Sequence, residues 1–190
     1  MLEKVKEAFD RFTFLTPNDL IQLALIVKVC SVKKDAHLVK VGDLNYNVMV
    51  VINGLVRHYV IDEQGNEKTL LFVSNKNPTT SMDTIFHNKP AVENIMALEN
   101  SLLIKFDFRA FEKLASGNIR LLKILNTVLK ETITSDVEYI RFLNLLTPEE
   151  RYIYFRKKYP DIVQRVKQKH LASYLGITTT SLSRLRARVI

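Results

Sequence analysis

The stretch QKHLASYLGITTTSLSRLR, residues 168–186, combines hydroxyl and guanidinium groups at a spacing that suits DNA recognition. Two short helices that cross steeply need a small residue where their backbones approach and a turn residue that tolerates positive φ. Ala172 and Gly176 meet these needs, and the apolar residues that would hold the crossing angle are Leu171, Leu175, Ile177, Leu182 and Leu185. The spacing therefore predicts a helix-turn-helix whose second helix begins near Thr179.

The second helix of this predicted motif would expose short hydroxyl groups followed by arginines. Such groups reach base edges and phosphates when a helix lies in the major groove of DNA. We expect DNA contacts from Thr179, Thr180, Ser181, Ser183, Arg184, Arg186 and Arg188, with Lys167 and Lys169 on the phosphate side. Arg184 is the first candidate for a base contact. The alternative interpretation is an ordinary helical hairpin with a solvated basic face.

Basic charge concentrates in the same part of the chain. The net charge is +8, and residues 146–190 hold ten basic and three acidic side chains, a net of +7. A basic end on a nearly neutral body indicates two functions, one of them directed at a polyanion. The single Cys30 excludes an internal disulfide and suits a reducing compartment. Because the apolar runs are too short to span a bilayer, we expect a cytoplasmic protein without membrane contact.

Other helices and strands must hold this predicted helix-turn-helix in place. Thr16, Pro17 and Asp19 predict a helix start, as N-cap, first-position proline and first-turn acid. From residue 28 to 107, short β-branched runs alternate with turn signals, which predicts an all-β body. Thr147 and Glu150 have the spacing of a capping box that opens another helix ahead of the reader.

The longest helical pattern runs from Asn118 to about Leu145. Its apolar positions step by three or four residues and form one stripe: Leu122, Leu125, Leu129, Ile133, Val137 and Ile140. At about 1.5 Å rise per residue this helix would be about 40 Å long, longer than one small β body needs. Periodicity alone leaves two interpretations open, a helix packed along its own domain and a seam between two copies.

With this order of elements, the chain resembles the cyclic-AMP receptor protein and FNR (CRP/FNR) family of bacterial transcription regulators. INGLVRHYVIDEQGNEKTLLFV is similar to the centre of that family's β-roll, ALENSLLIKFD to its close, and residues 146–186 to the short DNA-binding end of one branch. The resemblance implies an α+β fold with a cyclic-nucleotide-binding-like β-roll (a double-stranded β-helix or jelly roll) over 1–117. It implies a dimerisation helix over 118–145 and a helix-turn-helix domain over 146–190.

The same resemblance implies a function and a set of partners. The partners are double-stranded DNA with a pseudo-palindromic site, a second copy in a homodimer, and RNA polymerase. In this sequence, Thr179 and Thr180 stand where the family usually starts its recognition helix with Arg-Glu, while Arg184 matches a family arginine. The chain ends at Ile190 where many members continue into a β-hairpin wing. Both differences leave the operator sequence open.

The segment that cradles the nucleotide phosphate in this family departs from the family pattern. Cyclic-nucleotide-binding members use a Phe-Gly-Glu turn and a nearby arginine. Here NKNPTTSMDTIFHNKPAVENIMALE has no glycine, and it has Ala91 near the place of the arginine, with only the flexible Lys89 beside it. We therefore expect no cyclic AMP binding in the usual way and no other cofactor.

The polar residues of this segment form a candidate pocket for another ligand. They are Thr79, Thr80, Ser81 and Asp83, with Lys89 and Ala91 beside them. Ordinary turn chemistry explains the same hydroxyl and carboxyl groups more simply. His37, His58, His87 and His170 are scattered, so we expect each at a surface, turn or helix cap rather than at a metal or haem.

Catalysis finds no support in the sequence motifs. No nucleophile elbow, phosphate-binding loop, zinc pair or catalytic carboxylate pair has a recognisable spacing, so we expect no enzyme. The alternative function is a sensor that binds a small molecule or a protein and whose helical end does not bind DNA. Retention on heparin and on random duplex DNA as salt rises would separate the two functions, because DNA binding falls steeply with salt.

Overall fold

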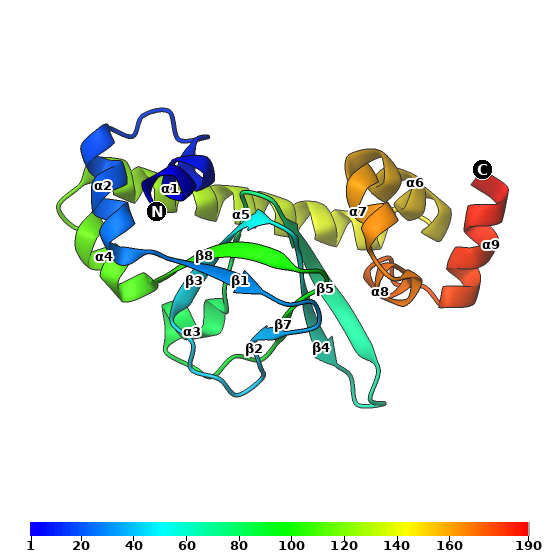
Figure 1. Ribbon diagram of the computed structural model, residues 1–190. Helices are drawn as coiled ribbons and strands as arrows, with labels where there is room; N and C mark the ends of the chain where they lie inside the picture. The colour runs from blue at the N-terminus through cyan, green and yellow to red at the C-terminus, as the bar shows by residue number, and fades with distance from the viewer. Residues whose placement is uncertain (190) are drawn as a thin grey trace. The chain divides into compact units, whose positions relative to one another are not determined.

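The computed structural model describes residues 1–189, so Ile190, the last residue of the predicted DNA-binding domain, lies outside the described residues (Figure 1). The described residues form two compact units, one of residues 1–58 and 72–128 and the other of residues 59–71 and 129–189. Helix α5, Ile119–Leu145, contributes to both units. No helix within residues 1–189 is long and apolar enough to cross a membrane.

The predicted β-roll is confirmed as two four-stranded sheets. The first sheet has the order β1-β8-β3-β6 and the second has the order β2-β7-β4-β5. The strands are β1 (Lys28–Val32), β2 (His37–Val39), β3 (Asn47–Asn53), β4 (Leu55–Ile61), β5 (Glu67–Ser74), β6 (Pro78–Thr79), β7 (Asn94–Ala97) and β8 (Ser101–Asp107).

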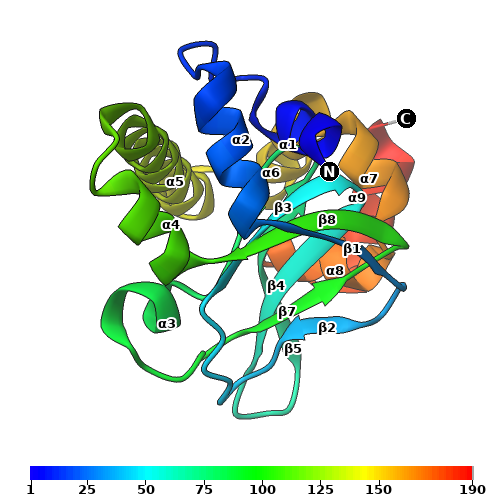
Figure 2. The same cartoon turned by 60° about the vertical axis from the view of Figure 1, so that its left-hand side comes forward.

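Alternation along the strands sends side chains into two apolar clusters, because successive residues of a strand face opposite sides. Val51 and Leu103 belong to the cluster inside the roll. Val50 and Ile104 belong to the outer cluster, which α1 (Leu2–Phe9), α2 (Pro17–Ile26) and α4 (Phe108–Ala115) cover together with the start of α5. These helices gather on one side of the sheets in Figure 2. The outer cluster therefore anchors α5 to the roll.

The predicted helix start at Thr16 is a complete capping box. The Thr16 amide donates to Asp19 Oδ2 at 2.8 Å, and Thr16 Oγ1 accepts from the Asp19 amide at 3.3 Å. Asp19 is fully buried and also binds the start of α5, where Arg120 Nε and Asn118 Nδ2 each donate to its carboxylate at 2.6 Å. The Arg120 guanidinium holds the pKa of Asp19 well below its usual range. This one carboxylate thus caps α2 and fixes the first turn of α5.

Apart from residues 59–71 of the β4–β5 hairpin, the second unit is helical, and after α5 it contains α6 (Pro148–Lys158), α7 (Pro160–Arg165), α8 (Gln168–Tyr174) and α9 (Thr179–Val189). The predicted capping box of Thr147 and Glu150 opens α6. Aromatic rings from α5, α6 and α8 pack together, and the closest pair is Tyr139 and Tyr174 with ring centroids 4.7 Å apart. Burial raises the pKa of Tyr139 to about 12, so at neutral pH its phenol stays protonated and donates to the Tyr174 carbonyl at 3.0 Å.

A short helix occurs in the segment that the sequence indicated as a polar loop. α3 covers Met82–His87, and Asn88 ends it in the left-handed conformation with φ 55°. The amide of Asn88 donates to the carbonyls of Asp83 and Thr84, which closes the last turn. The helix is only six residues long, too short for apolar periodicity to reveal it.

Candidate nucleic-acid interface

The turn of the helix-turn-helix lies between α8 and α9 and depends on Gly176. Its φ is +69°, and its amide donates to the Ser173 carbonyl at 3.1 Å. The Ile177 amide donates to the Ala172 carbonyl at 3.0 Å, so the last carbonyls of α8 are satisfied. A Cβ on Gly176 would lie 3.1 Å from Arg151 Nη1. The positive φ therefore favours glycine, and a Cβ would in addition crowd the Arg151 guanidinium.

The start of α9 is capped by a residue that the sequence prediction did not include. Thr178 Oγ1 accepts a hydrogen bond from the Ser181 amide at 3.1 Å, and the two hydroxyl groups lie 2.9 Å apart. Thr178 is thus the N-cap, and the hydroxyl of Ser181, an exposed residue and a predicted DNA contact, is hydrogen-bonded to it. A hydroxyl residue three positions ahead of another polar residue was the available sequence signal.

The predicted apolar residues hold the two helices together. Leu171, Ala172 and Leu175 of α8 are buried, as are Leu182 and Leu185 of α9. Because a helix repeats every 3.6 residues, the side of α9 opposite these leucines carries Thr180, Ser183, Arg184 and Ala187, all of which are exposed. Ala187 was not among the predicted contacts. It falls on this side because it lies four residues after Ser183.

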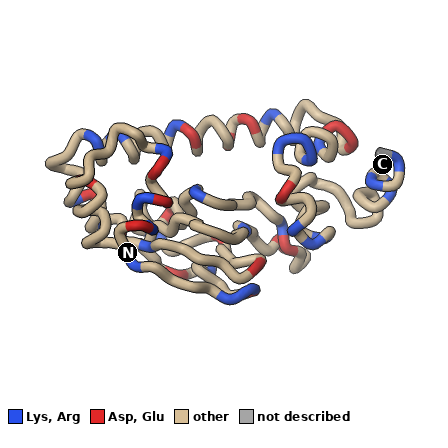
Figure 3. The backbone as a smooth tube through the Cα atoms, turned by 45° about the horizontal axis from the view of Figure 1, so that its top comes forward, with Lys and Arg blue, Asp and Glu red and all other residues tan. Residues whose placement is uncertain are grey.

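The remaining predicted contacts have different environments. Thr179 and Arg188 are exposed on α9, and Lys167 and Lys169 are exposed at the start of α8. Arg186 is half-buried, and its Nε is enclosed without a hydrogen-bond partner among residues 1–189. Lysines and arginines recur through α6 to α9 in Figure 3. Arg184 is exposed and has no partner among the described residues, so its guanidinium is available to a ligand.

Part of the basic charge serves the protein itself. Arg151 of α6 donates to three main-chain carbonyls, those of Leu143 at 2.6 Å, Leu146 at 3.0 Å and Leu175 at 2.9 Å. Leu143 lies in the last turn of α5, Leu146 directly follows that helix, and Leu175 precedes Gly176. Lys158 donates to Glu138 at 2.6 Å. Although partial burial opposes it, this bond raises the pKa of Lys158.

The tip of the β4–β5 hairpin, residues 59–71, binds α8 within the same unit. The Thr69 amide donates to Ser173 Oγ at 2.8 Å, and Ser173 Oγ donates to the Glu67 carbonyl at 3.0 Å. The Thr69 hydroxyl donates to the His170 carbonyl at 3.2 Å. His170 is buried, with Nδ1 3.8 Å from a carboxylate oxygen of Glu67. The hairpin therefore fixes α8 through main-chain groups.

In the roll, the predicted pocket residues lie in one segment but bond to the protein. Thr79, Thr80 and Ser81 are buried, and Ala91 belongs to the inner apolar cluster. The Thr80 hydroxyl donates to the Asn47 carbonyl at 3.0 Å. Asp83 is half-buried and Lys89 is exposed. The hydroxyl groups of this segment thus have partners within the chain.

His58 was expected at a surface, turn or cap, and this expectation is wrong, as it is for His170. His58 is 5% exposed, with Nδ1 3.0 Å from Glu93 Oε2 and Nε2 2.7 Å from Thr79 Oγ1. The β4 strand carries it inside because both of its faces are covered. Within residues 1–189, no group of three or more His, Cys, Asp or Glu side chains converges as a metal site would require.

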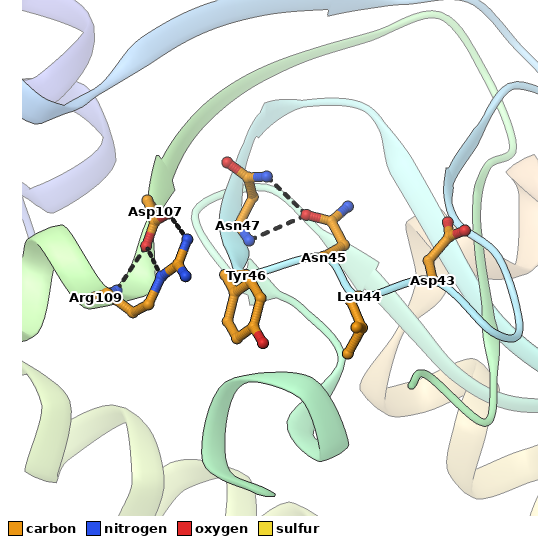
Figure 4. A pocket seen from close by; sticks show the side chains of 7 residues that line it. All are labelled: Asp43, Leu44, Asn45, Tyr46, Asn47, Asp107 and Arg109. Atoms are coloured by element: carbon orange, nitrogen blue, oxygen red, sulfur yellow. Dashed lines mark hydrogen bonds and ion pairs between the residues drawn. The ribbon is translucent and has the colours of Figure 1, made fainter. Parts of the chain in front are cut away.

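A pocket of about 420 Å³ opens elsewhere on the roll unit, at the start of β3 and the end of β8. Its charged side chains are shown in Figure 4, where Asp107 binds Arg109. The Arg109 guanidinium lies 4.0 Å from the centre of the Tyr46 ring and keeps the pKa of Asp107 below its usual range. The residues of the predicted pocket do not line it.

Comparison with known proteins gives one consistent result. Residues 29–118 match the family described as cyclic nucleotide-binding domain. The chain is 25% identical to Electron transport regulator A of Shewanella oneidensis, over 92% of this chain and 74% of the relative. It is also 25% identical to Regulatory protein HlyX of Actinobacillus pleuropneumoniae, over 92% and 77%.

The fold is likewise shared with a solved structure. FixK2 of Bradyrhizobium japonicum superposes with a TM-score of 0.77 at 16% identity, over 86% of this chain and 84% of that one. Residues 29–118 thus match a cyclic nucleotide-binding domain, and nearly the whole chain is similar to transcription regulators of the CRP/FNR type.

Proposed function

We propose that the chain is a homodimeric transcription regulator that reads double-stranded DNA with α8 and α9. The main observation in support is that α9 is amphipathic. One face buries Leu182 and Leu185, and the opposite face exposes Thr180, Ser183 and Arg184. Hydroxyl and guanidinium groups are the donors that read base edges in the major groove, and the surrounding lysines neutralise phosphates. Arg184 lies at the centre of this surface and carries the base contact.

Arg184→Ala is the direct test of the reading surface. A bidentate arginine contributes about 1–3 kcal/mol of discrimination against a wrong base, so we expect the variant to lose about that much preference for its operator over random DNA. The operator is first selected from a randomised duplex pool with the unchanged protein. Anisotropy titrations of the selected and random duplexes at two salt concentrations then give both affinities.

Lys169→Ala is the matched control because it removes one exposed charge from α8 without removing a base contact. We expect it to weaken binding to both duplexes alike and to reduce the salt slope by about 1. Unchanged discrimination in Arg184→Ala would contradict the assignment. So would an equal loss of discrimination in Lys169→Ala.

Dimerisation through α5 is supported by apolar side chains left open on that helix. Ile133, Val137 and Ile140 are 62%, 40% and 59% exposed, and their steps of four and three residues place them on one side of the helix. Exposed aliphatic residues in a row mark an interaction surface, and the same stripe on a second copy is its natural complement. A two-fold dimer would present two reading helices roughly 34 Å apart, one turn of DNA.

The roll does not bind cyclic AMP in the usual way under this proposal. Ala91, near the place where the family resemblance implies an arginine, is 2% exposed among apolar neighbours. The chain has no glycine between Gly65 and Gly117, so no main chain can approach a phosphate closely in that segment. The buried His58, bonded to the half-buried Glu93, also occupies the interior beside Thr79. A phosphodiester there would lose water without gaining a cation.

Titration calorimetry with cyclic AMP and, separately, cyclic GMP tests this part of the proposal. An uncompensated buried anion costs several kcal/mol, and each 1.4 kcal/mol weakens binding about tenfold. We expect no saturable heat at micromolar protein and ligand. Micromolar binding of either nucleotide would contradict the proposal for the roll and would leave the DNA-reading surface unaffected.

A further inference from the structure

A second, smaller cavity opens between the two sheets at the end of the roll formed by β1, β2, β3 and β8. Its volume is about 180 Å³, and we call it the mouth cavity. The residues that line it are Cys30, Val32, His37, Leu38, Asn45, Asn47, Met49, Leu103 and Lys105. It shares none of the residues of the Thr79–Ala91 segment. Open ends of β-barrels are common sites for small ligands.

Lys105 lines this cavity, and the exposed Lys28, which is not part of the lining, stands opposite it on the neighbouring strand. Leu103 belongs to the inner cluster and Ile104 to the outer one, so Lys105, two residues after Leu103, is on the inner side. Lys28 of β1 is paired directly with Lys105 across the strands. Directly opposite residues of an antiparallel pair have side chains on the same side of the sheet. The two lysine side chains therefore leave the sheet on the same side at directly opposite positions.

This lysine pair has no acidic partner among residues 1–189. The next inward carboxylate of β8, Asp107, is bound by Arg109 through Nη2 at 2.6 Å and Nε at 3.1 Å, as Figure 4 shows. The fold thus keeps two like charges opposite each other, an arrangement that destabilises a sheet. Local arrangements that cost stability, such as this pair of like charges, are found most often at functional sites.

The rest of the mouth cavity is partly amide and partly apolar. Asn45 Oδ1 accepts from the Asn47 amide at 3.1 Å and from Asn47 Nδ2 at 2.7 Å, and Asn45 Nδ2 donates to the Leu38 carbonyl at 3.1 Å. These bonds hold both amide side chains in place. Met49 and Leu103 supply an apolar lining beside Lys105. A ligand here would meet positive charge at one end and hydrocarbon at the other.

We propose that the mouth cavity binds a small organic carboxylate, with its anionic group on Lys28 and Lys105 and a short hydrocarbon part against Met49 and Leu103. At about 30 Å³ per water molecule, the cavity holds the volume of about six waters, which limits the ligand to a short chain. The anion relieves the repulsion within the lysine pair and gains charge-assisted hydrogen bonds. The proposal is independent of DNA binding.

Methionine methyl NMR tests the site with sodium butyrate as the probe. The chain has four methionines, of which only Met49 lines the mouth cavity. We expect butyrate to shift the Met49 methyl signal saturably, inorganic phosphate to act more weakly for lack of a hydrocarbon part, and chloride at equal ionic strength to have no such effect. An unsaturable shift, or equal effects of phosphate and butyrate, would overturn the proposal.

Lys105→Gln should abolish the butyrate response, whereas Lys113→Gln, the same change at an exposed position on α4, should retain it. Lys105→Met should also lose the response while raising Tm by about 1–4 °C, because the lysine repulsion is removed. Equal loss in Lys113→Gln would refute the site.

Alkylation of Cys30, the single cysteine, gives a readout on the unchanged protein. Because Cys30 lines the mouth cavity, butyrate should slow its reaction with iodoacetamide severalfold while chloride should not. An alkylation rate that butyrate leaves unchanged would count against the site even if the lysine variants failed to fold.

Discussion

Arg151→Ala is expected to lower the free energy of unfolding of the helical unit by about 2–4 kcal/mol, because hydrogen bonds from a charged donor each contribute about 1.5–3 kcal/mol and part of the site is open to water. The variant leaves the carbonyls of Leu143, Leu146 and Leu175 without their donor. Urea unfolding followed by tyrosine fluorescence measures the change, since the aromatic cluster of this unit contains Tyr139 and Tyr174 and the chain has no tryptophan.

Two further variants distinguish the hydrogen bonds of Arg151 to the three carbonyls from the effect of its positive charge. Lys157→Ala removes an exposed positive charge from the same helix and should change the unfolding free energy by less than about 0.5 kcal/mol. Arg151→Lys keeps the charge but has one compact ammonium in place of a planar fork, so it should recover only part of the loss. Equal stability of Arg151→Ala and Lys157→Ala would show that the three carbonyl bonds contribute nothing measurable.

Ile133→Lys is expected to dissociate the proposed dimer. The change removes an isoleucine from each copy, about 1.5–3 kcal/mol apiece when buried, and places two ammonium groups in the seam. A total of about 5 kcal/mol corresponds to more than a thousandfold weaker association. Sedimentation velocity over a range of protein concentrations measures this, and affinity for a two-half-site operator should fall with it because only one reading helix remains per particle.

Leu25→Lys is the matched control for this variant. Leu25 of α2 is 81% exposed and lies outside the α5 stripe, so the same substitution there should leave association unchanged. If Ile133→Lys remained dimeric, or if Leu25→Lys dissociated the protein equally, the seam would have to lie elsewhere. If the Ile133→Lys variant stayed dimeric but lost DNA binding, dissociation of the dimer would not be the cause of that loss.

Local signals in the sequence were enough to locate several helix starts and the extent of the β region. The capping boxes at Thr16 and Thr147 were predicted from spacing alone and both are present. β1 and β4 begin and end where their β-branched runs do. Caps and short strands involve residues within a few positions of each other, so their physical cause is contained in a short window. The short α3, by contrast, has too few residues to show a period.

The exposed residues of the helix-turn-helix were only partly predictable. The spacing of Ala172, Gly176 and the leucines follows from two helices in contact, and the turn at Gly176 has the positive φ that the sequence implied. That Ser181 is engaged by Thr178 and that Arg186 is half-buried depends on how α9 is rotated against α8. Sequence spacing limits this rotation without specifying each side chain.

Patterns in the sequence were enough to predict the order of β-roll, long helix and helix-turn-helix and the basic C-terminal end. Three contacts could be seen only in the folded chain: Arg151 binds carbonyls on both sides of its helix, Asp19 binds Arg120 about a hundred residues away, and Lys28 is paired with Lys105 across two strands. The reason is physical: periodicity and capping act between near neighbours, whereas a buried ion pair or a cross-strand pair forms only when distant segments are brought together. Those long-range contacts decide which charges of this protein are free to bind.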